Sequence, residues 1–388
     1  MAEGSSVALQ QRRHLRHRPR RPPSRLLRRL VMLLVLGLLG GGCALAALSW
    51  FLLDAGRSPR EWAPYLERRA VGHNRLIVDG TAIVSGYLLR ADRQPRREDP
   101  AIPVGVGASP ARSARPPTPM ARLVETPSQL AAAVAAATPG MVIQLVPGTY
   151  RLDGRGLALN RPGAPNAPIT LRAERLGDVT ILSSVVEAMK LSAPHWVIEN
   201  LILRGVCADH SDCEHAVHVV GAATDAVIRN NRFEDLNAQI KINGEDGNFP
   251  DRGRIEGNTL LNTTPRDTRN PITPIDLVAA SDWRIAGNFI ADFQRTGSPA
   301  ATYGAFMKGE GSGTVMERNM VLCEWKLRRS PYPNIGLSIG GGGSFPDAIK
   351  RRLGRTGAEQ EAGVIRDNVI AFCNDVGIYI NKGHRSVL

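Results

Sequence analysis

The chain has 388 residues, which allows one large domain or two ordinary ones. Aromatic residues make up only 5% of it, whereas 39 glycines and 27 prolines favour a turn-rich fold over a helical bundle. The net charge is +13, but residues 1–29 carry nine arginines against one acid, so the charge lies in one short segment. We therefore expect no nucleic-acid partner.

An uncharged apolar segment of 24 residues follows at 30–53. About 20 apolar residues span the hydrocarbon core of a bilayer, so this segment predicts a single transmembrane helix. A cleaved signal peptide is the alternative, although the apolar run is longer than such peptides usually have. Because basic residues at 1–29 favour the cytoplasmic side, we expect a single-pass membrane protein whose larger part lies in the periplasm or outside the cell.

Residues 54–121 are rich in arginine and proline and are predicted to form a solvated linker. Within this linker, the alternation at 75–90 predicts a short pair of strands. The next stretch, "TPSQLAAAVAAATPG", predicts a helix that caps the following domain. Thr126 is its expected N-cap, and Pro127 stands at its first helical position.

The remainder of the chain, 122–388, repeats a pattern of short apolar stretches around an asparagine. The separations of 27, 30, 31 and 49 residues indicate stacked repeats, and the period-2 alternation excludes helical ones. Each copy therefore predicts one coil of a parallel β-helix. Amides that stack at a shared corner can bond to one another as a ladder. The asparagines expected in this ladder are Asn231, Asn258, Asn288, Asn319 and Asn368, with Asn200 in the first copy. Since "VGIYINKGHRSVL" stops in mid-coil, we expect a C-terminal truncation.

Four cysteines lie beyond the apolar segment, where an exported location permits disulfides. Cys207 and Cys213 flank a loop of five residues that a disulfide would close. The alternative is a metal site that includes the nearby histidines His210, His215 and His218. No CxxC or HExxH pattern supports zinc, so we predict a disulfide and no metal site. Cys323 and Cys373 occupy equivalent places in two repeats and are expected to be buried.

One strand of each coil precedes the asparagine strand, and its alternate residues point away from the core. These outward residues predict a column of polar groups: His218, Lys241, Asp276, Lys308, Ser338 and Tyr379, with Gln239 and Asn243 beside it. Such a column suits an extended polysaccharide, and an ordinary polar surface is the alternative. On a straight strand His215 and His218 face opposite ways, so we expect His218 in the column and His215 as a structural histidine.

The stretch 123–174, which begins "LVETPSQLAAAV", and the repeats after it resemble polysaccharide lyases of the chondroitinase B and alginate lyase type. "CEHAVH" and "GLSIGGGG" also resemble stretches of uncharacterised exported β-helix proteins. The resemblance implies an all-β fold, a right-handed parallel β-helix of the pectate lyase kind. It implies a lysine base on a groove strand, a place similar to that of Lys308, followed by an arginine where this chain has Ser338. It also implies Ca²⁺, but no glutamates precede Lys308 to support that ion.

The sequence thus predicts a membrane-anchored, carbohydrate-active protein with lyase or epimerase chemistry on an acidic polysaccharide. Lys308 or His218 would remove a proton, and Lys241 would stabilise the developing charge. The residues expected to bind substrate are Asp276, Gln239, Asn243, Ser338 and Tyr379. The alternative is a non-catalytic glycan-binding or scaffold module of the cell envelope, because the fold does not decide between the two.

Overall fold

The computed structural model describes residues 29, 32–37, 40, 43, 50, 59–70, 72–91, 99–113, 121–328, 330–341 and 357–388. The chain divides into two units, Met1–Ser58 and Pro59–Leu388, and the fold below is that of the second. Most of the predicted anchor at 30–53 lies outside the described residues. Among the residues that are described, no helix has both the length and the apolar character needed to cross a membrane.

The segment predicted as a linker contains two helices, α2 (Pro59–Ala70) and α3 (Arg75–Ala91). They pack against each other, and the hydroxyl of buried Ser85 donates a hydrogen bond to the carbonyl of Ala63 at 3.1 Å. The strand pair predicted within α3 is therefore wrong. Its less exposed positions are 80, 81, 85, 86 and 88, and they do not alternate as those of a half-buried strand would.

Residues 99–113, also part of the predicted linker, are bonded to the β-helix. The backbone N–H groups of Ala108 and Ser109 donate to the side chains of Thr259 and Asn230, at 3.0 and 2.8 Å. The short 3-10 helix η1 (Pro110–Ser113) ends this stretch, and a second one, η2 (His210–Asp212), lies between two later strands. The predicted linker is thus largely structured where the chain is described.

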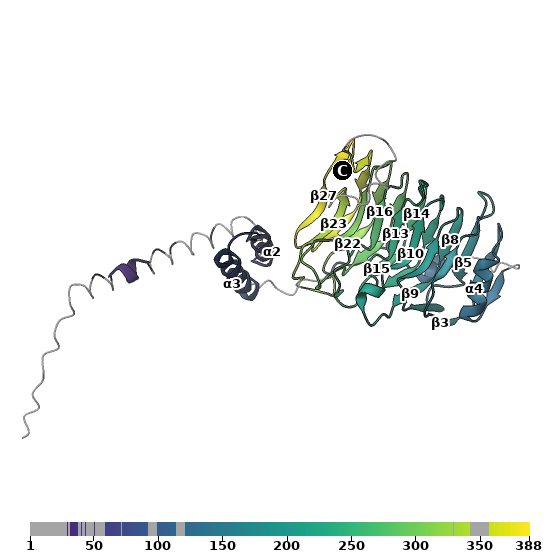
Figure 1. The fold of residues 1–388 in the computed structure, drawn as a ribbon, viewed down its shortest axis with the longest axis horizontal. Helices are drawn as coiled ribbons and strands as arrows, with labels where there is room; N and C mark the ends of the chain where they lie inside the picture. Colours follow the sequence, from purple (N-terminus) through teal and green to yellow (C-terminus); the bar gives the residue numbers. More distant parts are fainter. Residues whose placement is uncertain are drawn as a thin grey trace, which may run out of the picture. The chain divides into compact units, whose positions relative to one another are not determined.

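Three parallel sheets wind around one core, and successive strands of the chain visit them in turn (Figure 1). Sheet A comprises β1 (Arg122–Val124), β2 (Val142–Leu145), β5 (Ile169–Ala173), β8 (Trp196–Glu199), β11 (Val227–Arg229), β14 (Arg254–Glu256), β17 (Arg284–Ala286), β21 (Val315–Glu317) and β25 (Val364–Arg366). Sheet B comprises β3 (Gly148–Leu152), β6 (Val179–Ser183), β9 (Ile202–Gly205), β12 (Arg232–Glu234), β15 (Thr259–Leu261), β18 (Phe289–Ala291), β22 (Met320–Leu322) and β26 (Val369–Ala371).

Sheet C comprises β4 (Leu157–Leu159), β7 (Glu187–Leu191), β10 (His215–Val220), β13 (Ile240–Asn243), β16 (Ile275–Val278), β19 (Thr302–Lys308), β23 (Asn334–Ile339) and β27 (Val376–Ile380). A small fourth sheet holds β20 (Gly311–Ser312), β24 (Gln360–Glu361) and β28 (Gly383–His384). Within sheets A, B and C each strand pairs in parallel with its equivalent in the next coil, which is the arrangement of a parallel β-helix. Nearly all crossovers between parallel strands of one sheet are right-handed, and we expect the same handedness here.

The predicted capping helix is α4 (Pro127–Ala135), at the first coil (Figure 1). Thr126 is its N-cap, because the threonine hydroxyl accepts a hydrogen bond from the backbone N–H of Gln129 at 3.2 Å. Leu130 and Ala133 on one side of α4 are fully buried in the apolar core. The helix therefore closes that end of the core against water.

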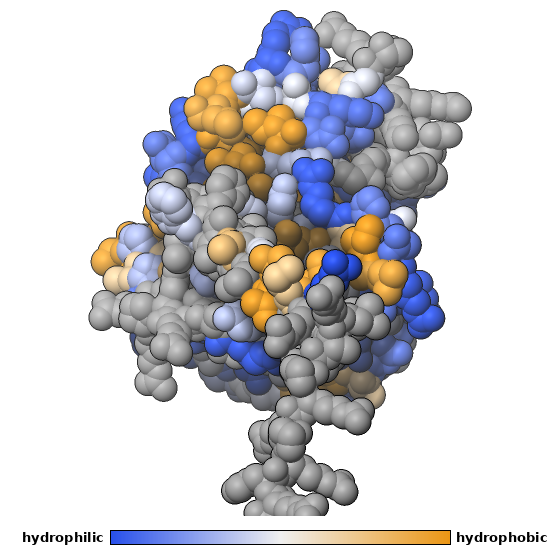
Figure 2. Space-filling view, turned by 90° about the vertical axis from the view of Figure 1, so that its left-hand side faces the viewer, coloured by the Kyte–Doolittle hydropathy of each residue, from blue (hydrophilic) through white to orange (hydrophobic). Residues whose placement is uncertain are grey.

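The other end of the β-helix is formed by its last coil, where apolar side chains are exposed. Ile378 in β27 is 39% exposed, whereas its partner in the preceding coil, Leu337, is fully buried. Figure 2 views the molecule from the side on which β27 lies, and apolar surface is visible there between polar regions. The difference in burial arises because β27 is the outer strand of sheet C.

A ladder of asparagines runs along one corner inside the β-helix. Each amide Nδ2 donates to the Oδ1 of the asparagine one coil further on, over distances of 2.9 to 3.2 Å. Its members are Asn231, Asn258, Asn288, Asn319 and Asn368. Asn200 is not one of them: Leu201 holds that place, and its N–H donates to Asn231. Asn200 instead has a left-handed backbone (φ 62°) and bonds to the side chain of Asn230.

Two disulfides cross-link the described part of the chain. Cys207 and Cys213 form one, across the short loop where it was predicted. Cys323 and Cys373 form the other, which joins neighbouring coils 50 residues apart in sequence. The interpretation of these two as merely buried residues missed the bond, since equivalent positions in adjacent coils are close enough for one.

Replacing both Cys323 and Cys373 by serine should lower the free energy of unfolding by about 2–4 kcal/mol, because the bond closes a long loop in the unfolded chain. The matched control replaces Cys207 and Cys213, which are only six residues apart, and should lose about 1–2 kcal/mol less. Urea unfolding followed by circular dichroism measures both variants. Equal losses would contradict the dependence on loop length.

Candidate functional site

The outward face of sheet C carries one row of residues in register. Strand pairing places Lys190, His218, Lys241, Asp276, Phe306, Ser338 and Tyr379 in line across successive coils. Phe306, and not Lys308, therefore stands between Asp276 and Ser338. Lys308 pairs with Val278, two residues further along β19, so it belongs to the same face but to the next row. A register shift of two residues leaves each side chain on the same face of the sheet, whereas a shift of one residue would move it to the opposite face.

Three of the residues predicted to bind substrate are buried: Gln239, Asp276 and Ser338. The Gln239 amide donates to Asn262 Oδ1 at 3.3 Å, and the Ser338 hydroxyl donates to the carbonyl of Gly340 at 2.7 Å. The polar groups of Gln239 and Ser338 are thus used inside the protein, and neither side chain is exposed on the outward face. Asn243 and Tyr379 are half-buried on the outward side.

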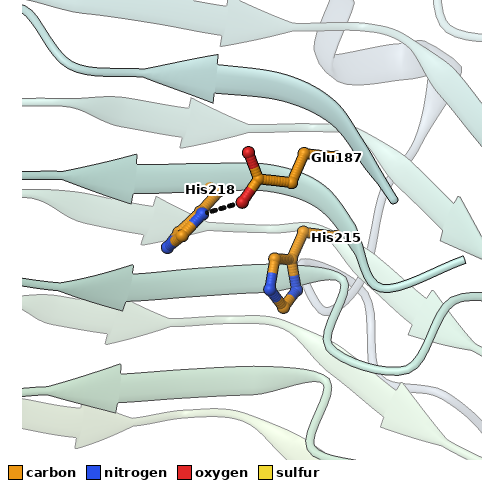
Figure 3. A group of neighbouring side chains, drawn as sticks. All are labelled: Glu187, His215 and His218. Carbon is orange, nitrogen blue, oxygen red and sulfur yellow. Dashed lines mark hydrogen bonds and ion pairs between the residues drawn. The ribbon is translucent and has the colours of Figure 1, made fainter. Parts of the chain in front are cut away.

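His215 and His218 lie on the same face of β10, together with Glu187 of β7 (Figure 3). The expectation that they face opposite ways is wrong because the alternation breaks in β10. Ala216 and Val217 are both buried, and their N–H groups both donate to the carbonyl of Gln239, at 3.1 and 3.0 Å. β7 has the same burial pattern between Glu187 and Lys190, so the register of the two strands is unbroken.

Each histidine ring has defined hydrogen-bond partners. His218 Nδ1 is 2.5 Å from Glu187 Oε1, and its Nε2 is 2.6 Å from Asn243 Oδ1. His215 Nδ1 is 3.2 Å from the carbonyl oxygen of Ala238, which can only accept, so Nδ1 carries the hydrogen. Burial is the main cause that lowers the pKa of His215 to about 4, and the neighbouring His218 and Lys241 act in the same direction. His215 is therefore a neutral imidazole whose Nε2 has a lone pair.

The lysines of this face differ in their surroundings. Lys241 Nζ bonds Asp276 Oδ2 at 2.7 Å, and Lys190 Nζ bonds Glu245 Oε1 at the same distance. Lys308 Nζ lies 4.2 Å from the centre of the Phe306 ring.

Lys308 is half-buried, and Phe306 belongs to a small apolar cluster outside the sheet with Val278, Ala279, Phe249 and Tyr303. Burial lowers the pKa of Lys308, and Lys241 lowers it further, while Asp276 and Glu359 act in the opposite direction.

No protein-family model matches the sequence, and no curated protein matches it either. Among solved structures the chain is similar to an alginate lyase from Paenibacillus sp. str. FPU-7, with 14% identity over 68% of this chain and 98% of that one and a TM-score of 0.40. It is also similar to a pectate lyase, with 13% identity over 65% of this chain and 72% of that one and a TM-score of 0.38. A family 6 polysaccharide lyase from Pseudopedobacter saltans is similar with 15% identity over 66% of this chain and 65% of that one and a TM-score of 0.33.

The chain thus resembles solved polysaccharide lyases. Identities and TM-scores this low carry no argument about its chemistry. We therefore derive the chemistry of this face from its own side chains.

Calcium, which the resemblance implies, does not fit the residues found here. Ca²⁺ prefers about six to eight oxygen ligands. The carboxylates on this face are each bonded to a nitrogen: Glu187 to His218, Asp276 to Lys241 and Glu245 to Lys190. A lysine ammonium so close to a carboxylate disfavours a second cation at the same oxygen atoms.

Sequence reasoning missed four residues of this face: Glu187, Lys190, Glu245 and Phe306. The first two lie in β7, the strand before the Asn200 copy, and the predicted column began only with the next coil. Phe306 and Lys308 are two residues apart in "AFMK", so both lie on the outward face. The polar lysine was therefore placed in the polar column, and Phe306 was missed. Its register depends on strand pairing, which the sequence pattern fixed only to within two residues.

Proposed function

We propose that the protein acts on an acidic polysaccharide laid across the outward face of sheet C, and cleaves it by β-elimination with Lys308 as the base. Lys241 would neutralise the carboxylate of the uronic acid. The observation that carries the proposal is the position of Lys308, half-buried against Phe306 on the same face as Lys241. Parallel coils repeat about every 4.8 Å, a rigid spacing suited to an extended polymer.

In the proposed elimination, Lys308 accepts one proton from the substrate and water supplies one proton to the leaving oxygen. The Lys308 amine takes the proton at the carbon that bears the uronate carboxylate. The electron pair of that bond forms a carbon–carbon double bond, and the bond to the 4-linked oxygen breaks. The departing oxygen takes up a proton from water. The ammonium of Lys241 opposes the negative charge that develops on the carboxylate, and such stabilisation acts most strongly in the transition state.

A lysine base must be neutral when it takes the proton, and burial of Lys308 favours the neutral amine. The charged groups near it are Asp276, Lys241 and Glu359. We expect the rate to rise with pH as Lys308 loses its proton, with a midpoint below the ordinary lysine value of 10.5.

Replacing Lys308 by methionine should lower kcat/KM at least about 100-fold, since general bases contribute about 10²–10⁴-fold. The measurement follows the ultraviolet absorbance of unsaturated uronate when the full-length chain is incubated with alginate, pectate, chondroitin sulfate and hyaluronan. The control is Lys190→Met on the same face, whose pair with Glu245 is about 40% exposed. It should change the rate less than about fivefold. Equal losses in both variants would rule out Lys308 as the base.

A non-catalytic glycan-binding module is the second candidate, and one observation favours it. Lys241 is already paired with Asp276, so the lysine has less charge to offer a substrate carboxylate. A folded protein that binds an acidic glycan but releases no unsaturated product from any of the four polymers would support binding over cleavage. Binding that is unchanged by Lys308→Met would point the same way.

We also propose that residues 30–53 anchor the protein in a membrane and that the β-helix lies on the non-cytoplasmic side. The uncharged run of 24 residues beside nine arginines supports this topology. The two disulfides suit an oxidising compartment. Protease added outside intact spheroplasts should digest the β-helix and leave the N-terminal tail. Recovery of the protein in the cytosolic fraction would contradict the proposal.

A further inference from the structure

Glu187, His215 and His218 form a cluster of metal-ligating groups that the proposed cleavage does not use (Figure 3). One ligand atom from each of the three residues lies within 4.8 Å of the other two. The residues come from two adjacent strands of sheet C, β7 and β10, whose pairing places Glu187 opposite His215. The rigid sheet therefore holds all three side chains at one place.

The outer hydrogen bonds of both histidines are those expected around a bound metal ion. Histidines that ligate a metal usually donate their other ring N–H to a carbonyl or carboxylate oxygen, which fixes the ring. His215 Nδ1 donates to the carbonyl of Ala238, and this leaves Nε2 as the ligating nitrogen. His218 Nε2 lies 2.6 Å from Asn243 Oδ1, and this leaves Nδ1 on the side of Glu187.

The break in alternation within β10 provides a second observation. On a regular strand His215 and His218 would lie on opposite faces. Ala216 and Val217 are instead both buried and share the carbonyl of Gln239, which places His215 on the side of His218.

We propose that Glu187, His215 and His218 bind a divalent transition-metal ion, with Zn²⁺ the best match to two imidazoles and one carboxylate. Three protein ligands leave a fourth position for water, as in open zinc sites. When the ion binds, the proton between His218 Nδ1 and Glu187 is released to water, and the ion takes its place between the two side chains. The nearest lysines are each paired with a carboxylate, Lys190 with Glu245 and Lys241 with Asp276, which limits their repulsion of a cation.

The proposal is tested by metal binding and needs no activity. Full-length protein in mild detergent, freed of metal by chelator and dialysis, is titrated with Zn²⁺ by calorimetry and with Co²⁺ by visible absorption. We expect one equivalent of each ion, with cobalt bands typical of a coordinated site. His215→Ala and Glu187→Gln should each weaken binding by more than about 100-fold, and Asn243→Ala by about 10–100-fold through the orientation of His218.

His384→Ala is the matched control, because this exposed histidine lies 3.8 Å from the carboxylate of Glu361 but belongs to no group of three metal-ligating residues in the described structure. It should leave the affinity unchanged. Binding of less than one equivalent, or binding that His215→Ala does not weaken in a variant with an unchanged circular dichroism spectrum, would overturn the proposal. Tight binding by a protein that cleaves no polysaccharide would leave the metal site standing and refute only the cleavage.

Discussion

Replacing Asn288 by alanine should lower the free energy of unfolding by about 4 kcal/mol or more. Asn288 is fully buried in the middle of the asparagine ladder. Its Oδ1 accepts from the backbone and the side chain of Asn258, at 2.9 and 3.1 Å. Its Nδ2 donates to the carbonyl of Ile255 and to Asn319 Oδ1, both at 2.9 Å. Alanine would remove these four hydrogen bonds in a place closed to water, at about 1 kcal/mol or more each.

The matched control is Asn248→Ala, at an exposed asparagine whose side chain donates only a 3.3 Å bond to the carbonyl of Asp246. Exposed substitutions of this kind usually change stability by less than about 0.5 kcal/mol. Urea unfolding of both full-length variants, followed by circular dichroism, gives the two values. If Asn288→Ala were as mild as the control, the ladder would not be a main source of stability.

The coils were predictable because their signal is local and repeated. An asparagine with aliphatic residues before and after it recurs at Asn231, Asn258 and Asn288, and each copy satisfies the same corner geometry. Asn200 shows the limit of that reasoning. Its backbone turns the chain as Asn230 does, one residue before the ladder position, so an asparagine alone does not identify its place in the corner.

The candidate site was only partly predictable, because it depends on hydrogen bonds between coils. The break in alternation in β10 accompanies two backbone N–H groups that share the carbonyl of Gln239, and backbone sharing leaves no mark on residue type. Strict alternation therefore separated His215 from His218. Glu187 comes from a coil 31 residues earlier, so its approach to His218 required the register of β7 on β10. Lys241 and Asp276 were placed correctly in one row, since alternation alone decides their face.

Replacing Lys241 by methionine should destabilise the protein by about 3–5 kcal/mol, whatever its role in function. Its partner Asp276 has a side chain only 9% exposed, and the two are joined at 2.7 Å. The other carboxylate oxygen of Asp276, Oδ1, is buried and has no hydrogen-bond partner within the described residues. Removing the ammonium would leave a buried carboxylate without its counter-charge.

The double variant Lys241→Met/Asp276→Leu separates stability from function. Replacing a buried ion pair by apolar residues of similar size is often neutral, so we expect its urea midpoint to lie within about 1 kcal/mol of the wild type. Its stability allows a fair test of glycan cleavage and binding, which the single variant would confound with unfolding. Loss of cleavage in the stable double variant would assign this pair to the substrate carboxylate. A single variant as stable as the wild type would instead mean that Asp276 does not depend on Lys241 for its stability in the fold.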